Sequence, residues 1–134
     1  MIGACPCGGV TVAVLRKPEY LNSCDCTLCF RLGGLWGYFD PAEVSVSGET
    51  KAFTRSDVEV WLRTNFCPTC GAVASWTAAR ELEPPRMGVN MRLFEPDDLV
   101  GIPVRFPNGR DWNDDDPRPP PRHAEIPFAR DAPF

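Results

Sequence analysis

Residues 66–71 read Phe66-Cys67-Pro68-Thr69-Cys70-Gly71, and Cys-Pro-x-Cys-Gly is a pattern typical of a metal-binding turn. Proline restricts φ early in such a turn and glycine permits a positive φ at its end, so backbone N–H groups can point toward the sulfurs. Residues 5–9, Cys-Pro-Cys-Gly-Gly, repeat these features near the start of the chain. Two thiolates from one tight turn can reach the same ion. The two turns together therefore supply four tetrahedral ligands.

The pairing of these turns predicts a closed four-thiolate zinc site. Its ligands are Cys5, Cys7, Cys67 and Cys70. Structural zinc sites have four protein ligands, and this one would join two turns separated by residues 8–66. Structural zinc binds with an apparent free energy of about 10–16 kcal/mol, against about 5–15 kcal/mol for the net stability of a domain. We therefore expect the domain to unfold when one ligand is lost.

A third cluster lies between the two turns, at Cys24-Asp25-Cys26-Thr27-Leu28-Cys29. Three thiolates from one loop suit a zinc site with an open fourth position, as catalytic zinc sites have. Reduced buried cysteines, or a disulfide formed during handling, would explain the cluster without metal. Asp25 would have to ligate from between two ligands of a tight turn, and the only histidine, His123, lies in a proline-rich tail. Neither is a good fourth ligand.

The composition favours a small β domain in the cytoplasm. The 134 residues include 15 prolines and 11 glycines, which favour strands and turns over long helices. A net charge of −4 and a pI near 4.9 disfavour binding to nucleic acid or anionic lipid. No apolar run reaches the ~20 residues of a membrane span, and residues 1–5 show no start of a secretory signal. Because cytoplasmic thiols stay reduced, seven cysteines indicate metal more than disulfides.

Short apolar and alternating segments predict a mostly β fold, with small twisted antiparallel sheets around the structural zinc. The expected strands cover 10–15, 35–39, 44–47, 51–54, 58–66, 72–77, 87–94 and 102–106, with one helical turn at 95–99 and a loop or turn at 22–31. From Pro107 the chain becomes acidic and proline-rich. We expect a zinc-binding β domain at 1–106 and an irregular proline-rich C-terminal tail at 107–134, extended or disordered.

The order of the cysteines and their flanking residues resembles the glutathione-dependent formaldehyde-activating enzyme (GFA) family, which includes the CENP-V domain. The matching residues are Cys5-x-Cys7-Gly8, Cys24-x-Cys26-x-x-Cys29-Phe30-Arg31, Phe66-Cys67-x-x-Cys70-Gly71 and the segment 86–93. The resemblance implies small twisted β-sheets around zinc, with two zinc ions per chain. It also implies a structural zinc at the outer pairs and a catalytic zinc at Cys24, Cys26 and Cys29. The family often has histidine between its first two middle cysteines, where this chain has Asp25.

The resemblance implies a carbon–sulfur lyase that adds a thiol such as glutathione to a small aldehyde, or reverses that addition. Three thiolates leave zinc a weak Lewis acid for water and suit a soft ligand such as a substrate thiol. Glutathione has two carboxylates, so Arg31, beside the triplet, and Arg92 are candidate substrate-binding residues. Asn90 is a candidate donor to a developing oxyanion. The sequence alone favours ordinary solvated surface positions for both arginines over a role in substrate binding.

A second interpretation is a non-catalytic, zinc-stabilised module that binds another protein. The departure at Asp25 and the proline-rich tail favour it. The aromatic residues Trp36, Tyr38 and Phe39 could line a pocket or belong to an ordinary core strand. We expect a small-molecule thiol and an aldehyde as partners, no nucleic acid and no membrane, and a homodimer is compatible with the tail.

Overall fold

The computed structural model describes residues 1–113, 115 and 119–131, which form two β-sheets with few helices. The strands are β1 (Ile2–Ala4), β2 (Thr11–Val14), β3 (Leu21–Asn22), β4 (Trp36–Phe39), β5 (Val44–Ser47), β6 (Lys51–Phe53), β7 (Leu62–Phe66), β8 (Val73–Ala78), β9 (Met87–Asn90), β10 (Pro103–Phe106) and β11 (His123–Pro127). The helices are α1 (Thr27–Leu32) and α2 (Pro96–Leu99), with 3-10 turns η1 (Pro41–Glu43) and η2 (Met91–Leu93).

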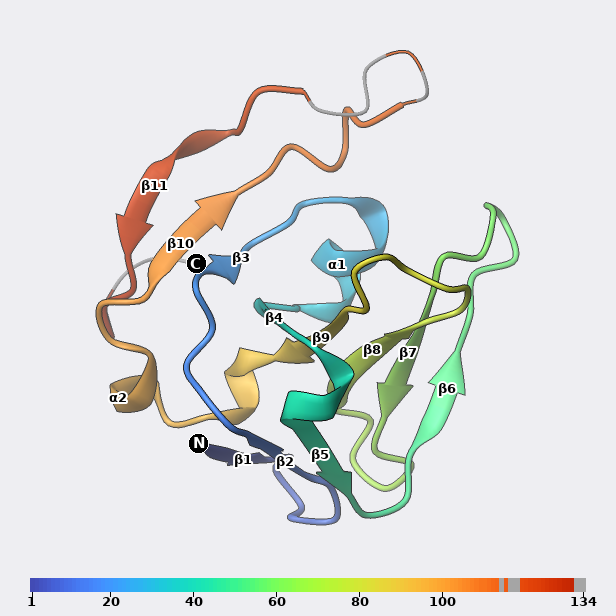
Figure 1. Cartoon of the computed structure of the whole chain (residues 1–134), viewed down its shortest axis with the longest axis vertical. Helices are drawn as coiled ribbons and strands as arrows, with labels where there is room; N and C mark the ends of the chain where they lie inside the picture. Colours follow the sequence, from blue (N-terminus) through green and yellow to red (C-terminus); the bar gives the residue numbers. More distant parts are fainter. Residues whose placement is uncertain (114, 116–118, 132–134) are drawn as a thin grey trace.

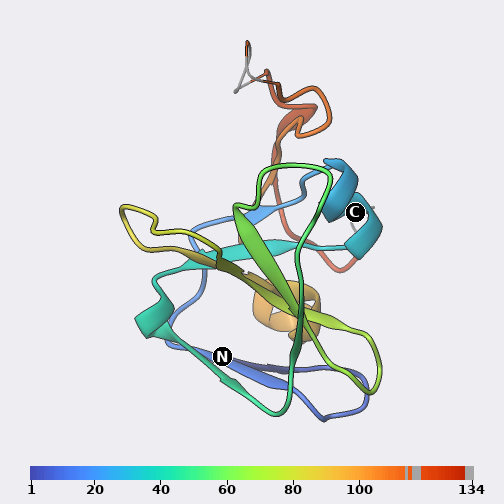
Figure 2. The same cartoon turned by 90° about the vertical axis from the view of Figure 1, so that its right-hand side faces the viewer.

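The small sheet has three strands in the order β1-β2-β5, and the large sheet has eight in the order β11-β10-β3-β4-β9-β8-β7-β6. The small sheet lies below the large one in Figures 1 and 2. The pairs are antiparallel except β3 and β10, which pair in parallel through Val104 and Leu21. The fold is thus mostly β, with cysteine clusters that could hold zinc, as the sequence predicts.

One apolar core joins the two sheets. Val12 of β2 is fully buried from the small sheet, and Leu21, Val89 and Val104 are fully buried from the large one. Burying such a side chain contributes about 1.5–3 kcal/mol relative to leaving it exposed. The core therefore fixes the position of one sheet on the other, and with it the two cysteine turns that lie at their ends.

The expected strands match best where turn residues or aromatic runs mark the ends. The segment 44–47 is β5 as predicted, and the expected turn at 95–99 contains α2. The predicted strand at 58–66 is wrong in its first half: β7 begins at Leu62, and Val58, Val60 and Trp61 are exposed. β6 ends at Phe53 and β8 at Ala78, so no described strand lies beside this half, although the Trp61 carbonyl accepts a hydrogen bond from the Ala79 N–H at 2.9 Å.

The loop expected at 22–31 contains the short helix α1. Cys26 caps it, accepting a hydrogen bond from the Cys29 N–H, and Gly33 ends it in the left-handed conformation. The helix therefore starts within the cysteine triplet itself. Likewise, the strand expected at 87–94 ends at Asn90, whose side chain caps η2.

Part of the proline-rich segment joins the large sheet. β11 pairs with β10 of the same chain, Arg105 forms an ion pair with Glu125 at 2.8 Å, and the Phe106 ring contacts His123. Backbone pairing explains how a segment with few apolar residues is held. Asp114, Asp116, Pro117 and Arg118 of the acidic, proline-rich run lie outside the described residues. The boundary at 106/107 stays a prediction.

Among the described residues, no helix is long and apolar enough to span a membrane.

Candidate metal centres

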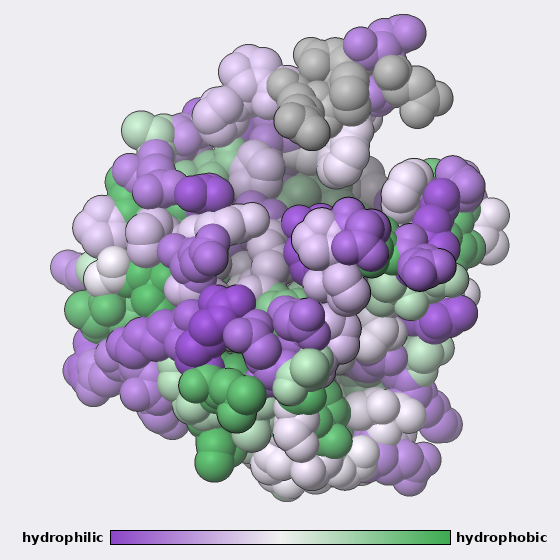
Figure 3. Space-filling model, viewed as in Figure 1, coloured by the Kyte–Doolittle hydropathy of each residue, from purple (hydrophilic) through white to green (hydrophobic). Residues whose placement is uncertain are grey.

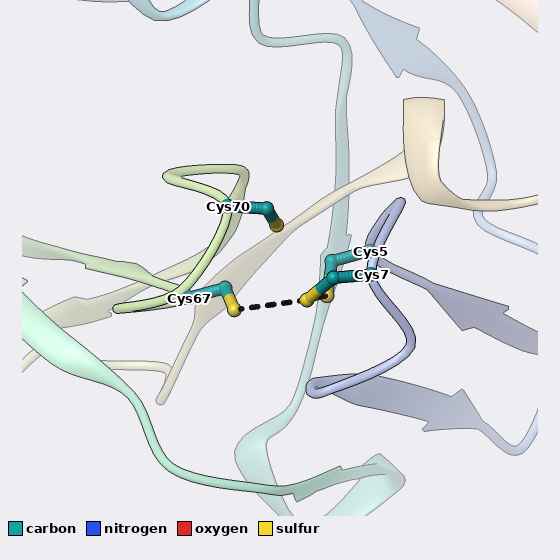
Figure 4. A group of neighbouring side chains, drawn as sticks. All are labelled: Cys5, Cys7, Cys67 and Cys70. Atoms are coloured by element: carbon teal, nitrogen blue, oxygen red, sulfur yellow. Dashed lines mark hydrogen bonds between the residues drawn. The ribbon is translucent and has the colours of Figure 1, made fainter.

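The first centre is built from two turns that belong to different sheets. Cys5 and Cys7 lie between β1 and β2, and Cys67 and Cys70 lie between β7 and β8. Figure 4 shows the side chains of Cys5 and Cys7 pointing toward Cys67 across the gap between the turns. All four sulfurs lie within 4.8 Å of one another. The structure thus brings together the four cysteines that the turn pattern pairs.

The proline and glycine residues of these turns have the expected conformational role. Gly8 and Gly71, which follow the second cysteine of each turn, have φ of 73° and 74°. With the chain turned this way, the Gly9 N–H donates to the Cys7 sulfur at 3.4 Å and the Val10 N–H donates to the Cys5 sulfur at 3.2 Å. These N–H groups stabilise thiolates, which are the form that binds metal.

The spacing of the sulfurs fits a tetrahedral metal. The Cys5 and Cys7 sulfurs are 3.5 Å apart, and the Cys7 and Cys67 sulfurs are 3.6 Å apart. Four sulfurs at the Zn–S distance of about 2.3 Å would be about 3.8 Å apart. Sulfur ligands in this arrangement are typical of zinc.

The acid–base properties of the four thiols also favour a cation. Burial alone would raise the pKa of Cys5, but the Val10 N–H and the neighbouring sulfurs outweigh it and lower that pKa to about 6. The Gly9 N–H lowers the pKa of Cys7, but the sulfurs of Cys5, Cys67 and Cys70 raise it to about 12. One sulfur becomes charged at the expense of the next because like charges repel. A bound cation would allow all four to ionise.

The second centre is the loop at the start of α1. The sulfurs of Cys24, Cys26 and Cys29 lie within 4.8 Å of one another, and all three are half-buried. The Cys26 N–H donates to the Cys24 sulfur and the Cys29 N–H to the Cys26 sulfur, each at 3.4 Å. Hydrogen bonds from Cys24, Cys29 and backbone N–H groups lower the pKa of Cys26 to about 2. The sulfurs of Cys24 and Cys26 raise the pKa of Cys29. No fourth His, Cys, Asp or Glu joins this group among the described residues.

The two residues considered as a fourth ligand face elsewhere. The Asp25 carboxylate accepts hydrogen bonds from the backbone N–H groups of Gly109 and Arg110. His123 lies in β11, where its ring meets Phe106 edge-on at 5.6 Å. All seven cysteines are free of disulfides.

The three predicted substrate-binding residues line one cavity. Arg31, Asn90 and Arg92 border a space of about 660 Å³ that lies between the end of α1 and the turns at Pro6 and Gly71. None of the described cysteines lines this cavity. The cavity therefore borders the end of α1, whereas the triplet lies around the start of that helix. The roles predicted for its residues stay predictions.

Asn90 makes several contacts with the backbone. Its side-chain NH₂ donates to the Val73 carbonyl at 2.9 Å, and its side-chain oxygen accepts from the N–H groups of Leu35 and Arg92, each at 3.3 Å. These bonds join Asn90 to β8, to η2 and to Leu35, the residue before β4. Arg31 and Arg92 are exposed.

The aromatic residues of β4 differ in their surroundings. Trp36 and Phe39 are buried, with 2% of each exposed. Tyr38 is half-buried, its hydroxyl accepts a hydrogen bond from the Asn22 side chain, and burial raises its pKa. Tyr38 and Phe39 border a second cavity of about 290 Å³, and none of the three aromatic residues borders the cavity of Arg31, Asn90 and Arg92.

Sequence reasoning missed Arg55, which lies beside the triplet. It donates to the Thr27 hydroxyl of α1 at 3.3 Å and pairs with Asp57 at 2.6 Å. The hydrogen bond from Arg55 to the Asp57 carboxylate lowers the pKa of Asp57 to about 2. Residue 55 is distant from every cysteine cluster along the chain, so no local pattern could have indicated this contact.

Comparisons with known proteins identify one family and a similar solved structure. The family described as "Glutathione-dependent formaldehyde-activating enzyme" (GFA) matches residues 1–101. A crystal structure of a Rhodobacter sphaeroides protein, solved by structural genomics, is similar at a TM-score of 0.61 and 25% sequence identity, covering 78% of this chain and 99% of that one. No curated protein matches the chain.

Proposed function

This chain belongs to the GFA family, whose match spans residues 1–101, and on that premise we propose that it is a carbon–sulfur lyase of the GFA type. In the proposed reaction a thiol such as glutathione adds to a small aldehyde, or the adduct is cleaved. The fold and the two clusters of cysteines are compatible with this chemistry. The proposal assigns zinc to both clusters.

The observation that carries the proposal is the unequal number of sulfurs in the two clusters. Four sulfurs converge at the junction of the sheets and three at the start of α1. A four-ligand zinc site is saturated and structural, whereas a three-ligand site has room for a substrate atom. We therefore assign Cys5, Cys7, Cys67 and Cys70 a structural role and the triplet a catalytic one.

Bound at the triplet, zinc would lower the pKa of a substrate thiol and so supply a thiolate at neutral pH. The sulfur would then form a bond to the aldehyde carbon while the C=O π bond breaks. The carbonyl oxygen takes up the proton that the thiol gave up, and the product is an S-hydroxyalkyl adduct. Atoms and charge balance without any further reactant.

The chain's own residues would bind and orient the two reactants. Arg31 and Arg92 are exposed cations on one cavity, and arginine pairs well with the carboxylates that glutathione carries. Asn90 has one further amide N–H that could donate to a developing oxyanion. Holding both reactants side by side lowers the entropic barrier of the addition.

We place the protein in the cytoplasm, where glutathione keeps thiols reduced. Seven cysteines free of disulfides support this location.

A non-catalytic protein-binding module is the second candidate. Large apolar side chains are exposed around the β6–β7 loop, where Phe53, Val58 and Trp61 are at least 50% exposed. Hydrophobic and hydrophilic residues are intermingled on the face seen in Figure 3. A protein partner, or a second copy of this chain, would bury such residues.

Metal counting on reduced protein tests the assignment of the clusters. We expect two zinc ions per chain, and one per chain in Cys29→Ser with the fold intact. Thr27→Ser, which changes α1 beside the triplet without removing a sulfur, is the control and should keep both. A single zinc in the reduced parent protein would contradict the open second site.

Adduct exchange tests the reaction itself. Protein, glutathione and a series of small aldehydes are mixed, and exchange between free aldehyde and adduct is followed by NMR. We expect exchange faster than in the protein-free mixture for at least one aldehyde, and loss of that acceleration in Cys29→Ser. If every aldehyde exchanges at the protein-free rate, the binding module becomes the better description.

A further inference from the structure

The segment after β10 packs directly on the cysteine triplet. Asp25, between Cys24 and Cys26 in the sequence, accepts hydrogen bonds from the Gly109 N–H at 2.9 Å and the Arg110 N–H at 3.2 Å. Residues 102–134 lie beyond the part matched by the GFA family. This contact is therefore made by a part of the chain outside the family match.

Gly109 touches the sulfur of Cys24. A Cβ at residue 109 would lie 2.5 Å from the Cys24 sulfur and 2.9 Å from the Cys26 Cβ, closer than Cβ atoms approach other heavy atoms. The φ of Gly109 is not in the left-handed region. Glycine is needed here for space, because the backbone lies against the thiol.

Arg122 holds the same segment from a second direction. Its Nη2 donates to the Ser23 carbonyl at 2.6 Å and its Nε donates to the Pro107 carbonyl at 3.3 Å, and it forms an ion pair with Asp25 at 3.4 Å. The Asp25 side chain in this pair is only 18% exposed. Charge-assisted hydrogen bonds at a half-buried site are stronger than surface ion pairs.

We propose that the segment 107–110, defined here as the wall segment, is a fixed side of the three-cysteine site and limits the size of the molecules that reach Cys24. Asp25 is its positioning residue and Gly109 its contact with the sulfur. Small reagents reach the triplet and bulky ones are excluded at Cys24. Asp25 thus has a definite structural partner in the backbone of Gly109 and Arg110. This inference concerns access alone and holds whether or not the site performs the proposed addition.

Thiol modification of the full-length, metal-bound protein tests this inference. The rates at which iodoacetamide and a bulky fluorescein maleimide modify Cys24 are measured by peptide mass spectrometry, with a free cysteine-containing peptide in the same mixture as the reference. We expect Asp25→Ala and Arg122→Gln each to raise the maleimide rate at Cys24 by about tenfold or more, because charge-assisted bonds to the wall segment are lost. The iodoacetamide rate should rise much less.

Arg105→Gln is the matched control. It removes the ion pair with Glu125 in the neighbouring β10–β11 pair but touches neither Asp25 nor the wall segment. An unchanged ratio of maleimide to iodoacetamide rates in both test variants overturns the proposal, and so does an equal rise in Arg105→Gln. If Asp25→Ala does not fold or loses metal, Arg122→Gln, which changes no residue of the triplet loop, decides alone. Thiol modification and aldehyde exchange are separate measurements. A negative result for access to Cys24 therefore leaves the proposed reaction standing, and a negative result for aldehyde exchange leaves the wall segment standing.

Discussion

Loss of Cys67 should destabilise the protein far more than loss of a cysteine in the triplet. Cys67 is 1% exposed, and its sulfur lies 3.6 Å from that of Cys7, 60 residues away in the chain. A metal at this site therefore closes a long loop and joins the two sheets. Chain entropy assigns about 4 kcal/mol to a cross-link over a loop of this length.

The same reasoning gives a smaller value for the triplet. Cys24 and Cys29 lie within one short segment that includes the start of α1, and a cross-link over so few residues contributes about 2 kcal/mol. Cys67→Ser should thus lose about 2 kcal/mol more than Cys29→Ser. With an m-value of about 2 kcal/mol/M in urea, the unfolding midpoints should differ by about 1 M.

Urea unfolding of both variants, with excess zinc and a reducing agent, measures this difference. Cys70→Ser, which removes an exposed ligand of the same centre, is the companion to Cys67→Ser if that variant does not fold. A strong chelator should remove metal from both centres and so bring the midpoint of the parent protein to that of Cys67→Ser or below it. Midpoints for Cys67→Ser, Cys70→Ser and Cys29→Ser that agree within experimental error would refute the cross-link argument.

Two further predictions concern a strained turn and an ion pair. Gly48→Ala should destabilise the protein by about 1–3 kcal/mol or more, measured by urea unfolding. The φ of Gly48 is 96°, and the new Cβ would lie 2.0 Å from the Gly9 carbonyl oxygen. Gly101→Ala is the control and should lose less stability, because Gly101 has a φ of 83° but no described atom within 4 Å of its Cβ. Arg55→Gln should raise the pKa of Asp57 from about 2 toward its ordinary value of 3.8, measured by NMR titration of the carboxyl group. Because the paired carboxylate has a lowered pKa, its contribution to stability is present above pH 3.8 and is lost as pH falls toward 2; an unchanged titration in Arg55→Gln would contradict the pairing.

The features that sequence reasoning predicted are those with a local chemical cause. The turn at 66–71 can be predicted from the sequence because proline restricts φ early in the turn and Gly71 permits the positive φ at its end. The same pattern at residues 5–9 identified the partner turn, although 60 residues separate Cys7 from Cys67. The conformation of each turn is set within a few residues, so a short pattern is enough.

The features that it missed depend on contacts between distant segments. Asp25 and Gly109 are 84 positions apart, and neither residue has a neighbour that indicates the other. Alternation predicted a strand over 58–66, but residues 58–61 lie outside β7, because a strand needs a paired neighbour and β6 ends at Phe53. The parallel pairing of β3 with β10 could not be predicted from the sequence either, because β3 consists of Leu21–Asn22 alone and is too short to show a strand pattern.

The sequence separation of Gly109 from the triplet has a consequence for biosynthesis. The last sulfur of the four-cysteine centre, Cys70, is translated before Gly109 and Arg122. At about 5–20 residues per second, a growing chain spends about 2–8 s with every sulfur of both clusters made and no glycine against Cys24. During that interval the triplet is open on a side that Gly109 covers in the finished protein. A metal ion that binds the triplet, as we propose, would therefore reach it most easily while the ribosome is still adding residues.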